Sequence, residues 1–283
     1  MPSLRDIRRR IDSVKSTQKI TRAMKMVAAA KLRRAQEAIE QARPYAYHMR
    51  DLVNRVALRA SHGTHPLLQE TPEGKVAIIV VSSDRGLCGG FNSNVTNETM
   101  RVLGEDFAGR EVALTVVGKK GNEVLRRRPC TIAKSYTKVM EDDPLRAAGQ
   151  IIDEQVDAFI AGETHEVYCL YNEFKSAISQ KLTLEKLLPF EPPPRAEVVV
   201  DYLYEPSQEG VLTQLLARHL QVQMLRIFYE SAASEHGARM TAMDSATNNA
   251  GDVIERLTLQ FNRARQSAIT TEMIEIVSGA EAL

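Results

Sequence analysis

The sequence predicts an antiparallel coiled coil of N- and C-terminal helices with an inserted Rossmann-like α/β domain. Two patterns point to this class, α/β plus long α. Residues 3–60 and 208–281 place apolar side chains at alternating steps of three and four, the spacing of a coiled-coil seam. Residues 75–205 alternate β-rich runs with helical segments, as in a parallel sheet flanked by helices. We therefore expect three domains, a helix in 1–60, the α/β domain in 75–205 and a helix in 208–283.

The first helix carries its seam on aliphatic and small side chains. The seam residues are Leu4, Ile7, Ile11, Val14, Ala28, Leu32, Ala35, Ile39, Ala42, Ala46, Met49, Val53 and Val56. Pro44 lacks a backbone N–H, so it should kink this helix or loosen it.

The same seam is interrupted once. Between its two apolar stretches the register meets polar side chains, at Gln18, Thr21 and Lys25. An apolar stripe runs there on a neighbouring face, through Ile20, Met24 and Val27. A shifted stripe predicts a stutter or a local change of winding.

The last helix repeats the seam pattern and is longer than the first. Its seam residues are Ala233, His236, Met240, Met243, Thr247, Ala250, Ile254, Leu257, Phe261, Ala264 and Ala268. A helix of this length runs roughly 105 Å, far more than its own chain can bury. Its C-terminal end should therefore project unpaired, and an apolar tip of this kind implies a sleeve in another protein.

The middle segment contains the strands. Residues 75–81, 112–117 and 167–171 are nearly continuous β-rich runs, which favours buried parallel strands. Two further runs, residues 180–188 and 196–203, suggest edge strands.

A glycine-rich turn follows the first strand, where a doubly wound fold binds phosphates. Its glycines, Gly86, Gly89 and Gly90, match neither G-x-G-x-x-G nor a P-loop, which favours a structural or interface turn over a nucleotide site. Asp84 and Arg85 could serve in acid–base catalysis, but the sequence places no second carboxylate to pair with them. A dinucleotide-dependent oxidoreductase is the enzyme alternative, and it would need the missing phosphate fingerprint.

Cysteine and histidine spacing indicates neither a metal centre nor a nucleophile. Cys88, Cys130 and Cys169 form no CxxC pair or zinc spacing, so packed thiols are the simplest interpretation. His62 and His65 would need two further groups to ligate a metal, which favours a polar loop. We therefore expect no catalytic residue, no metal site and no cofactor.

Residues 1–43 are strongly basic, with twelve lysines and arginines against four aspartates and glutamates. Three interpretations remain: a solvated helix face, a nucleic-acid contact, or an acidic protein neighbour. No aromatic side chain precedes Tyr45 to stack on bases, and the basic residues alternate with the seam. An acidic loop of a surrounding protein fits this helix best, and no nucleic-acid partner is expected.

Three stretches of the chain resemble the gamma subunit of bacterial F-type (rotary) ATP synthases. They are Thr17-Gln-Lys-Ile-Thr-Arg-Ala-Met-Lys-Met-Val-Ala-Ala-Ala-Lys31, the Ser83-Asp-Arg-Gly-Leu-Cys-Gly-Gly90 turn, and residues 264–280. The last contains the family's terminal signature, here Ile269, Thr270, Glu272, Glu275, Gly279 and Ala280.

This resemblance implies a non-catalytic rotor shaft that couples transmembrane proton flow to ATP synthesis at the beta subunits. It implies as partners three alpha and three beta subunits, the epsilon subunit and the membrane ring of c subunits. It also implies a peripheral position on the cytoplasmic face of the bacterial plasma membrane, with membrane contact through partners. A coiled-coil adaptor with a globular α/β insert is the structural alternative.

The resemblance also implies which residues contact the partners. It puts Met24 and Lys25 near the acidic lever loop of beta. It puts five residues of the last helix against the alpha/beta collar or the facing shaft helix: Arg239, Arg265, Gln266, Thr270 and Glu272.

Overall fold

The computed structural model describes residues 3–57, 65–69, 74–191, 205 and 207–281. They form two compact units. Residues 1–28 and 239–283 belong to the first, and residues 29–238 to the second. The long helices α1 (Leu4–Ala57) and α5 (Gln208–Glu281) each contribute to both units.

The second unit contains a five-stranded sheet in the order β3-β2-β1-β4-β5. The strands are β1 (Val76–Val81), β2 (Val112–Val117), β3 (Thr131–Tyr136), β4 (Glu166–Phe174) and β5 (Gln180–Leu188). Strands β1 to β4 are parallel, and β5 pairs antiparallel with β4 at the edge. The predicted class, long helices with a Rossmann-like sheet, is therefore confirmed.

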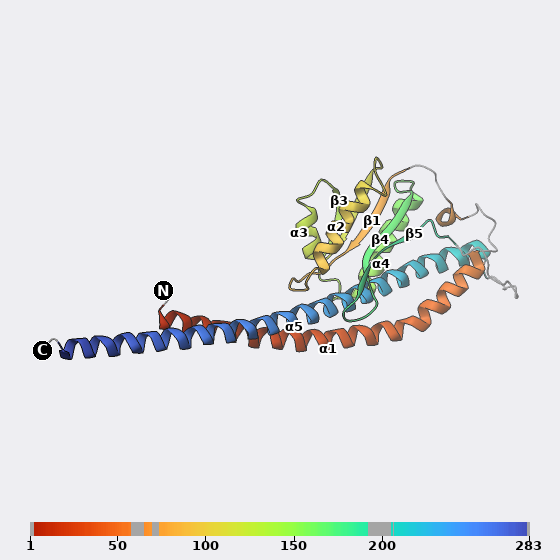
Figure 1. The fold of residues 1–283 in the computed structure, drawn as a ribbon. Helices are drawn as coiled ribbons and strands as arrows, with labels where there is room; N and C mark the ends of the chain where they lie inside the picture. The colour runs from red at the N-terminus through yellow and green to blue at the C-terminus, as the bar shows by residue number, and fades with distance from the viewer. Residues whose placement is uncertain (1–2, 58–64, 70–73, 192–204, 206, 282–283) are drawn as a thin grey trace. The chain divides into compact units, whose positions relative to one another are not determined.

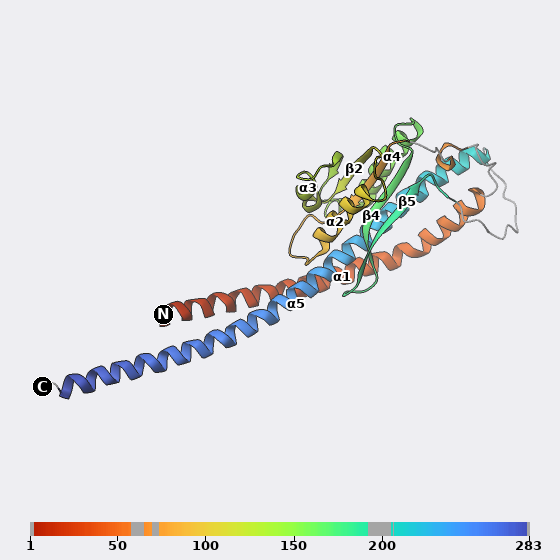
Figure 2. The same ribbon diagram turned by 45° about the horizontal axis from the view of Figure 1, so that its top comes forward.

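Helices cover both faces of the sheet (Figures 1 and 2). The side chains of β1 alternate between two cores, as the period of a strand requires. One core joins β1 and β2 to α2 (Phe91–Gly104) and α3 (Lys119–Leu125). The other joins β1, β4 and β5 to α4 (Pro144–Ile160), to the first turns of α5 and to the last turn of α1. The long helix α5 is thus part of the core of this unit.

Three details of the second unit differ from the sequence predictions or lie beyond them. Strand β3 was not predicted; its residues are mostly exposed or half-buried, so the run lacks the continuous apolar character of the other parallel strands. The predicted strand at residues 196–203 lies outside the described residues. Helix α1 continues through Pro44 and curves in its orange part (Figure 1).

In the first unit, α1 and α5 run antiparallel. Successive contacts pair Lys25 with Asp244, Thr21 with Thr247, and Gln18 with the backbone of Thr247. Within the described residues, no helix has the length and apolar character needed to cross a bilayer.

We predict that Phe228→Ala destabilises the chain by about 3–5 kcal/mol, because Phe228 is fully buried against the sheet and its removal leaves a cavity. Urea unfolding of the full-length chain measures the change. Ile178→Ala is the control, since Ile178 is 82% exposed and its loss should cost under about 0.5 kcal/mol. Equal effects would show that α5 is not a core element.

Candidate functional site

The seam of the first unit turns polar over one short stretch. Ile7, Ile11 and Ala28 of α1 are buried apolar residues, and Thr21 lies between them with 9% of its surface exposed. The Thr21 hydroxyl is 2.8 Å from the Thr247 hydroxyl of α5. Because these hydroxyls bond across the seam, a polar residue occupies a buried position without losing its hydrogen bonds.

Lys25 occupies the next seam position and forms an ion pair across it. Its Nζ lies 2.6 Å from Oδ1 of Asp244, and the two side chains are 41% and 46% exposed. Gln18, on the other side of Thr21, donates from Nε2 to the carbonyl of Thr247 at 3.4 Å. The seam register therefore continues unbroken through polar side chains.

The predicted stutter is consequently wrong. Ile20 and Val27 are 60% and 57% exposed, and Met24 is half-buried. The hydrogen bonds and the ion pair to α5 satisfy the polar residues in the seam, so the helix has no reason to rewind. The apolar stripe is left on the outer surface of α1.

The outer surface of α1 is also basic. Every lysine and arginine between residues 3 and 22 is exposed: Arg5, Arg8, Arg9, Arg10, Lys15, Lys19 and Arg22. Ile20, Met26 and Val27 add exposed apolar surface. A surface of this kind suits a partner that offers acidic groups beside apolar ones.

The seam ends before α5 does. Ala264 is the last half-buried residue, and every side chain described from residue 265 to 278 is exposed. The apolar ones, Ile269, Met273, Ile274, Ile276 and Val277, are 50–68% exposed. The predicted unpaired tip is confirmed.

The predicted site residues fall into three settings. Met24 and Lys25 lie on α1 at the polar part of the seam, and Arg239 is buried on α5 with 8% exposed. The other four, Arg265, Gln266, Thr270 and Glu272, are all on the exposed tip. The Thr270 hydroxyl donates to the Gln266 carbonyl within the helix, at 2.9 Å.

Two residues of the polar seam were not predicted as site residues, Asp244 and Thr247. Thr247 was already in the predicted seam of α5, as Thr21 was in that of α1. Aligning the two seams in antiparallel order would have paired the threonines. The Lys25–Asp244 pair then follows one helical turn away.

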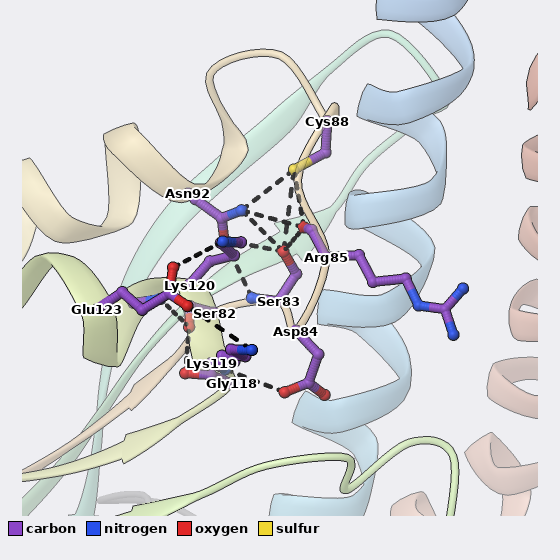
Figure 3. Close-up of polar contacts among 11 residues, drawn as sticks. Ser82, Ser83, Asp84, Arg85, Cys88, Asn92, Gly118, Lys119, Lys120 and Glu123 are labelled. Carbon is purple, nitrogen blue, oxygen red and sulfur yellow. Dashed lines mark hydrogen bonds and ion pairs between the residues drawn. The ribbon is translucent and has the colours of Figure 1, made fainter. Parts of the chain in front are cut away.

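The glycine-rich turn follows the carboxyl end of β1, and the strand order reverses between β1 and β4. A doubly wound fold places ligands there. Figure 3 shows the polar contacts of the turn. Asn92, at the start of α2, accepts from the Ser83 backbone N–H at 3.0 Å and donates to the Cys88 sulfur at 3.3 Å. The turn is therefore closed on itself by its own side chains.

Asp84 connects the turn after β1 to two neighbouring loops. Its two carboxylate oxygens accept from the backbone N–H groups of Lys119, at 3.0 Å, and Lys138, at 2.9 Å. Lys119 is the first residue of α3, and a helix N-terminus is where such folds bind phosphate. The carboxylate thus joins the loops after β2 and β3, and it supports the interpretation of the turn as structural.

Close packing fills the rest of this edge. The Ser82 hydroxyl donates to the Val117 carbonyl at 2.8 Å and accepts from the Gly121 N–H at 3.0 Å. Gly118 has φ 98°, and a Cβ there would lie 2.4 Å from the Ser82 carbonyl oxygen. Only glycine fits this approach of the β2 loop to β1.

The thiols and histidines have structural surroundings. Cys88 and Cys169 are buried, and burial raises the pKa of Cys169 well above its ordinary value. His65 is also buried; its Nδ1 accepts from the Leu67 N–H at 3.2 Å, and its Nε2 lies 2.8 Å from the Thr213 hydroxyl. His62 lies outside the described residues, among which no cluster could hold a metal ion.

Comparisons with known proteins identify relatives over the whole chain. The family described as ATP synthase matches residues 3–283. The ATP synthase gamma chain of Anaeromyxobacter sp. (strain Fw109-5) is 51% identical over 289 residues, which cover 100% of each chain.

Solved structures share the fold. A chain of the Tetrahymena thermophila mitochondrial ATP synthase central stalk and c-ring is 28% identical, with a TM-score of 0.61 over 80% of this chain and 99% of its own. A chain of the Euglena gracilis mitochondrial ATP synthase, from its OSCP/F1/c-ring structure, has a TM-score of 0.71 at 20% identity. It covers 99% of this chain and 94% of its own length.

The Lys25–Asp244 pair should contribute modestly to stability, because both side chains are partly exposed. A double-mutant cycle with Lys25→Ala and Asp244→Ala should give a coupling energy of about 0.2–1 kcal/mol that decreases as salt is added. Chemical unfolding of the full chain at low and high salt measures it. A coupling energy of zero at low salt would show that Lys25 and Asp244 do not stabilise the seam by an ion pair.

Gly118→Ala should be much more damaging than Gly109→Ala, although both positions have positive φ. A Cβ at Gly109 meets nothing within 4 Å, so that variant reports backbone strain alone. Gly118→Ala should lose about 1–3 kcal/mol more, the usual cost of overpacking. Thermal unfolding compares the two variants, and similar losses would contradict the close packing at Ser82.

Proposed function

The chain belongs to the ATP synthase gamma-chain family, and we propose that its two terminal helices are the parts that act on the catalytic subunits. As a bacterial gamma chain it is the central rotor shaft of an F-type ATP synthase. It couples transmembrane proton flow to ATP synthesis and hydrolysis by rotation. The observation that carries this function is the match over the full length of the chain.

The partners of such a shaft are three alpha and three beta subunits, the epsilon subunit and the ring of c subunits. The chain itself is non-catalytic in our proposal, and nucleotide chemistry takes place on beta. Support comes from the turn after β1, whose side chains bond within the chain: Asp84 accepts from the N–H groups of Lys119 and Lys138, and Asn92 accepts from that of Ser83.

Coupling depends on the shape of the shaft. As the shaft turns, each beta subunit meets a different side of it. A shaft can shift a catalytic site between open and closed states only by binding those states with different affinity. The exposed surfaces of α1 and α5 are therefore the functional surfaces.

The surface of α1 around Met24 and Lys25 faces the acidic lever loop of beta in this proposal. The exposed basic residues of α1 and the exposed Ile20 and Val27 support this contact. Because Lys25 already pairs with Asp244, the other basic side chains supply most of the attraction to an acidic loop.

The tip of α5 runs inside the alpha/beta collar. Arg265, Gln266, Thr270 and Glu272 are exposed and available to the collar, whereas Arg239 is buried. The apolar side chains beyond them suit a bearing, since apolar contacts are not directional and allow sliding.

We divide the chain into functional domains at 1–60, 75–205 and 208–283, with the α/β domain outside the catalytic ring. That domain contacts epsilon and the c-ring. The complex is a peripheral assembly on the cytoplasmic face of the bacterial plasma membrane, and this chain reaches the membrane only through its partners.

Reconstitution with the alpha and beta subunits of the same source tests the function. We expect the full chain to give an active, stoichiometric complex that hydrolyses ATP, and the chain alone to show no activity. A chain that ends at Ala264 lacks only the exposed tip. It should assemble but hydrolyse ATP more slowly, because the collar contacts are lost.

Two outcomes would contradict the proposal. A chain that forms no complex would favour an adaptor with other partners. A chain that turns over a substrate on its own would indicate that the α/β domain is an enzyme.

A further inference from the structure

The β4–β5 hairpin lies along one stripe of α5. Residues 226, 230, 234 and 237 follow each other at helical spacings of four, four and three, so they share one side of the helix. The Ser234 hydroxyl donates to the Asn172 carbonyl of β4 at 3.0 Å. A Cβ on Gly237 would lie 3.0 Å from the carbonyl oxygen of Ala177, in the turn of the hairpin. The hairpin therefore contacts the helix over about three turns.

Arg226 is the centre of these contacts. Its Nη2 donates to both carboxylate oxygens of Glu185 on β5, at 2.9 and 2.8 Å. Its Nη1 donates to Glu230 at 2.9 Å, and its Nε to Gln223 at 2.8 Å. The Tyr171 hydroxyl of β4 donates to Glu185 at 2.8 Å. All three guanidinium nitrogens are used, and two strands are joined to the helix.

The cluster is largely shielded from water. The side chains of Arg226, Glu185 and Glu230 are 24%, 27% and 12% exposed. Burial disfavours the charge of Arg226, yet Glu185, Tyr171 and Glu230 hold its pKa above the ordinary value. Burial raises the pKa of Glu230. A charge pair in these surroundings is directional and weakly screened by salt.

The two carboxylates have different mechanical roles. Glu230 lies on α5, as Arg226 does, so their pair stays within one helix. Glu185 lies on β5, so its pair with Arg226 joins the helix to the sheet. The apolar core also joins α5 to the sheet, and the Arg226–Glu185 pair adds a directional contact to it.

We propose that Arg226 is a positioning residue that locks the β4–β5 hairpin to α5 through Glu185, so that the α/β domain and the helix turn as one body. This inference rests on the proposed rotor function. In a rotor that receives torque at its domain and delivers it along its helix, the contacts between domain and helix set how far one twists relative to the other. The Arg226–Glu185 contact limits this twist where the sheet meets the helix.

Single-molecule rotation of the assembled complex tests this inference. The alpha and beta subunits are fixed to a surface, and a bead is attached to a cysteine introduced at the exposed Asn97 on α2. With catalysis stalled, the angular fluctuation of the bead reports how tightly the α/β domain follows the shaft. We expect Arg226→Met and Glu185→Gln to widen the fluctuation relative to the parent chain.

Glu230→Gln is the matched control. It makes the same chemical change as Glu185→Gln and removes a carboxylate charge that contacts the same guanidinium, but the pair it weakens lies within α5. We expect it to leave the fluctuation unchanged. A purely electrostatic or stabilising role of the cluster would make the two glutamine variants alike, and that result would overturn the proposal.

Two further outcomes separate the role of Arg226 from the rotor function. Unchanged fluctuation in Arg226→Met, in a complex that rotates normally, would overturn the inference and leave the rotor function intact. Failure of the parent chain to assemble or rotate would instead overturn the rotor function on which the inference rests.

Discussion

A helix of 74 residues has more side-chain surface than one chain of this size can cover, and this constraint organises the molecule. Between residues 212 and 228, α5 packs its apolar side chains into the core formed with the sheet, α4 and the end of α1. From residue 239 to 264 it has the seam with α1, and the side chains described from residue 265 to 278 are exposed. The three stretches of the helix therefore differ in their surroundings, and we propose that they fix the helix to a domain, stiffen it and contact other subunits respectively.

Strong local patterns predicted most of the fold. The strands at 75–81, 112–117 and 180–188 and the bounds of α5 are close to those in the structure, because continuous β-rich runs and a sustained three-four period are unambiguous. Strand β3 was missed because it is an edge strand with no buried residue, so it lacks the continuous apolar run of β1 and β2, which have the same length. The stutter was predicted wrongly because apolar residues were assumed to face the partner helix, whereas Thr21 and Lys25 do so with partners on α5.

The candidate site was predictable where it depends on one helix and not where it depends on two elements. Exposure of the tip follows from the difference in helix length. The partner of Lys25 requires the antiparallel register, and the role of Asp84 requires the loops after β2 and β3 to meet. Arg226 looks like one more surface arginine in the sequence, and only the fold brings Glu185 and Tyr171 to it.

Asp84 has a consequence for a protein that works among nucleotide-binding subunits. Anything that binds a folded domain selectively stabilises it by mass action, so a nucleotide-binding rotor would become stiffer or softer as cellular ATP rose and fell. The Asp84 carboxylate already provides, within the chain, the negative charge that a phosphate would bring to these backbone N–H groups. Its bonds to these two N–H groups hold the loops after β1, β2 and β3 together through a charge that the chain itself carries.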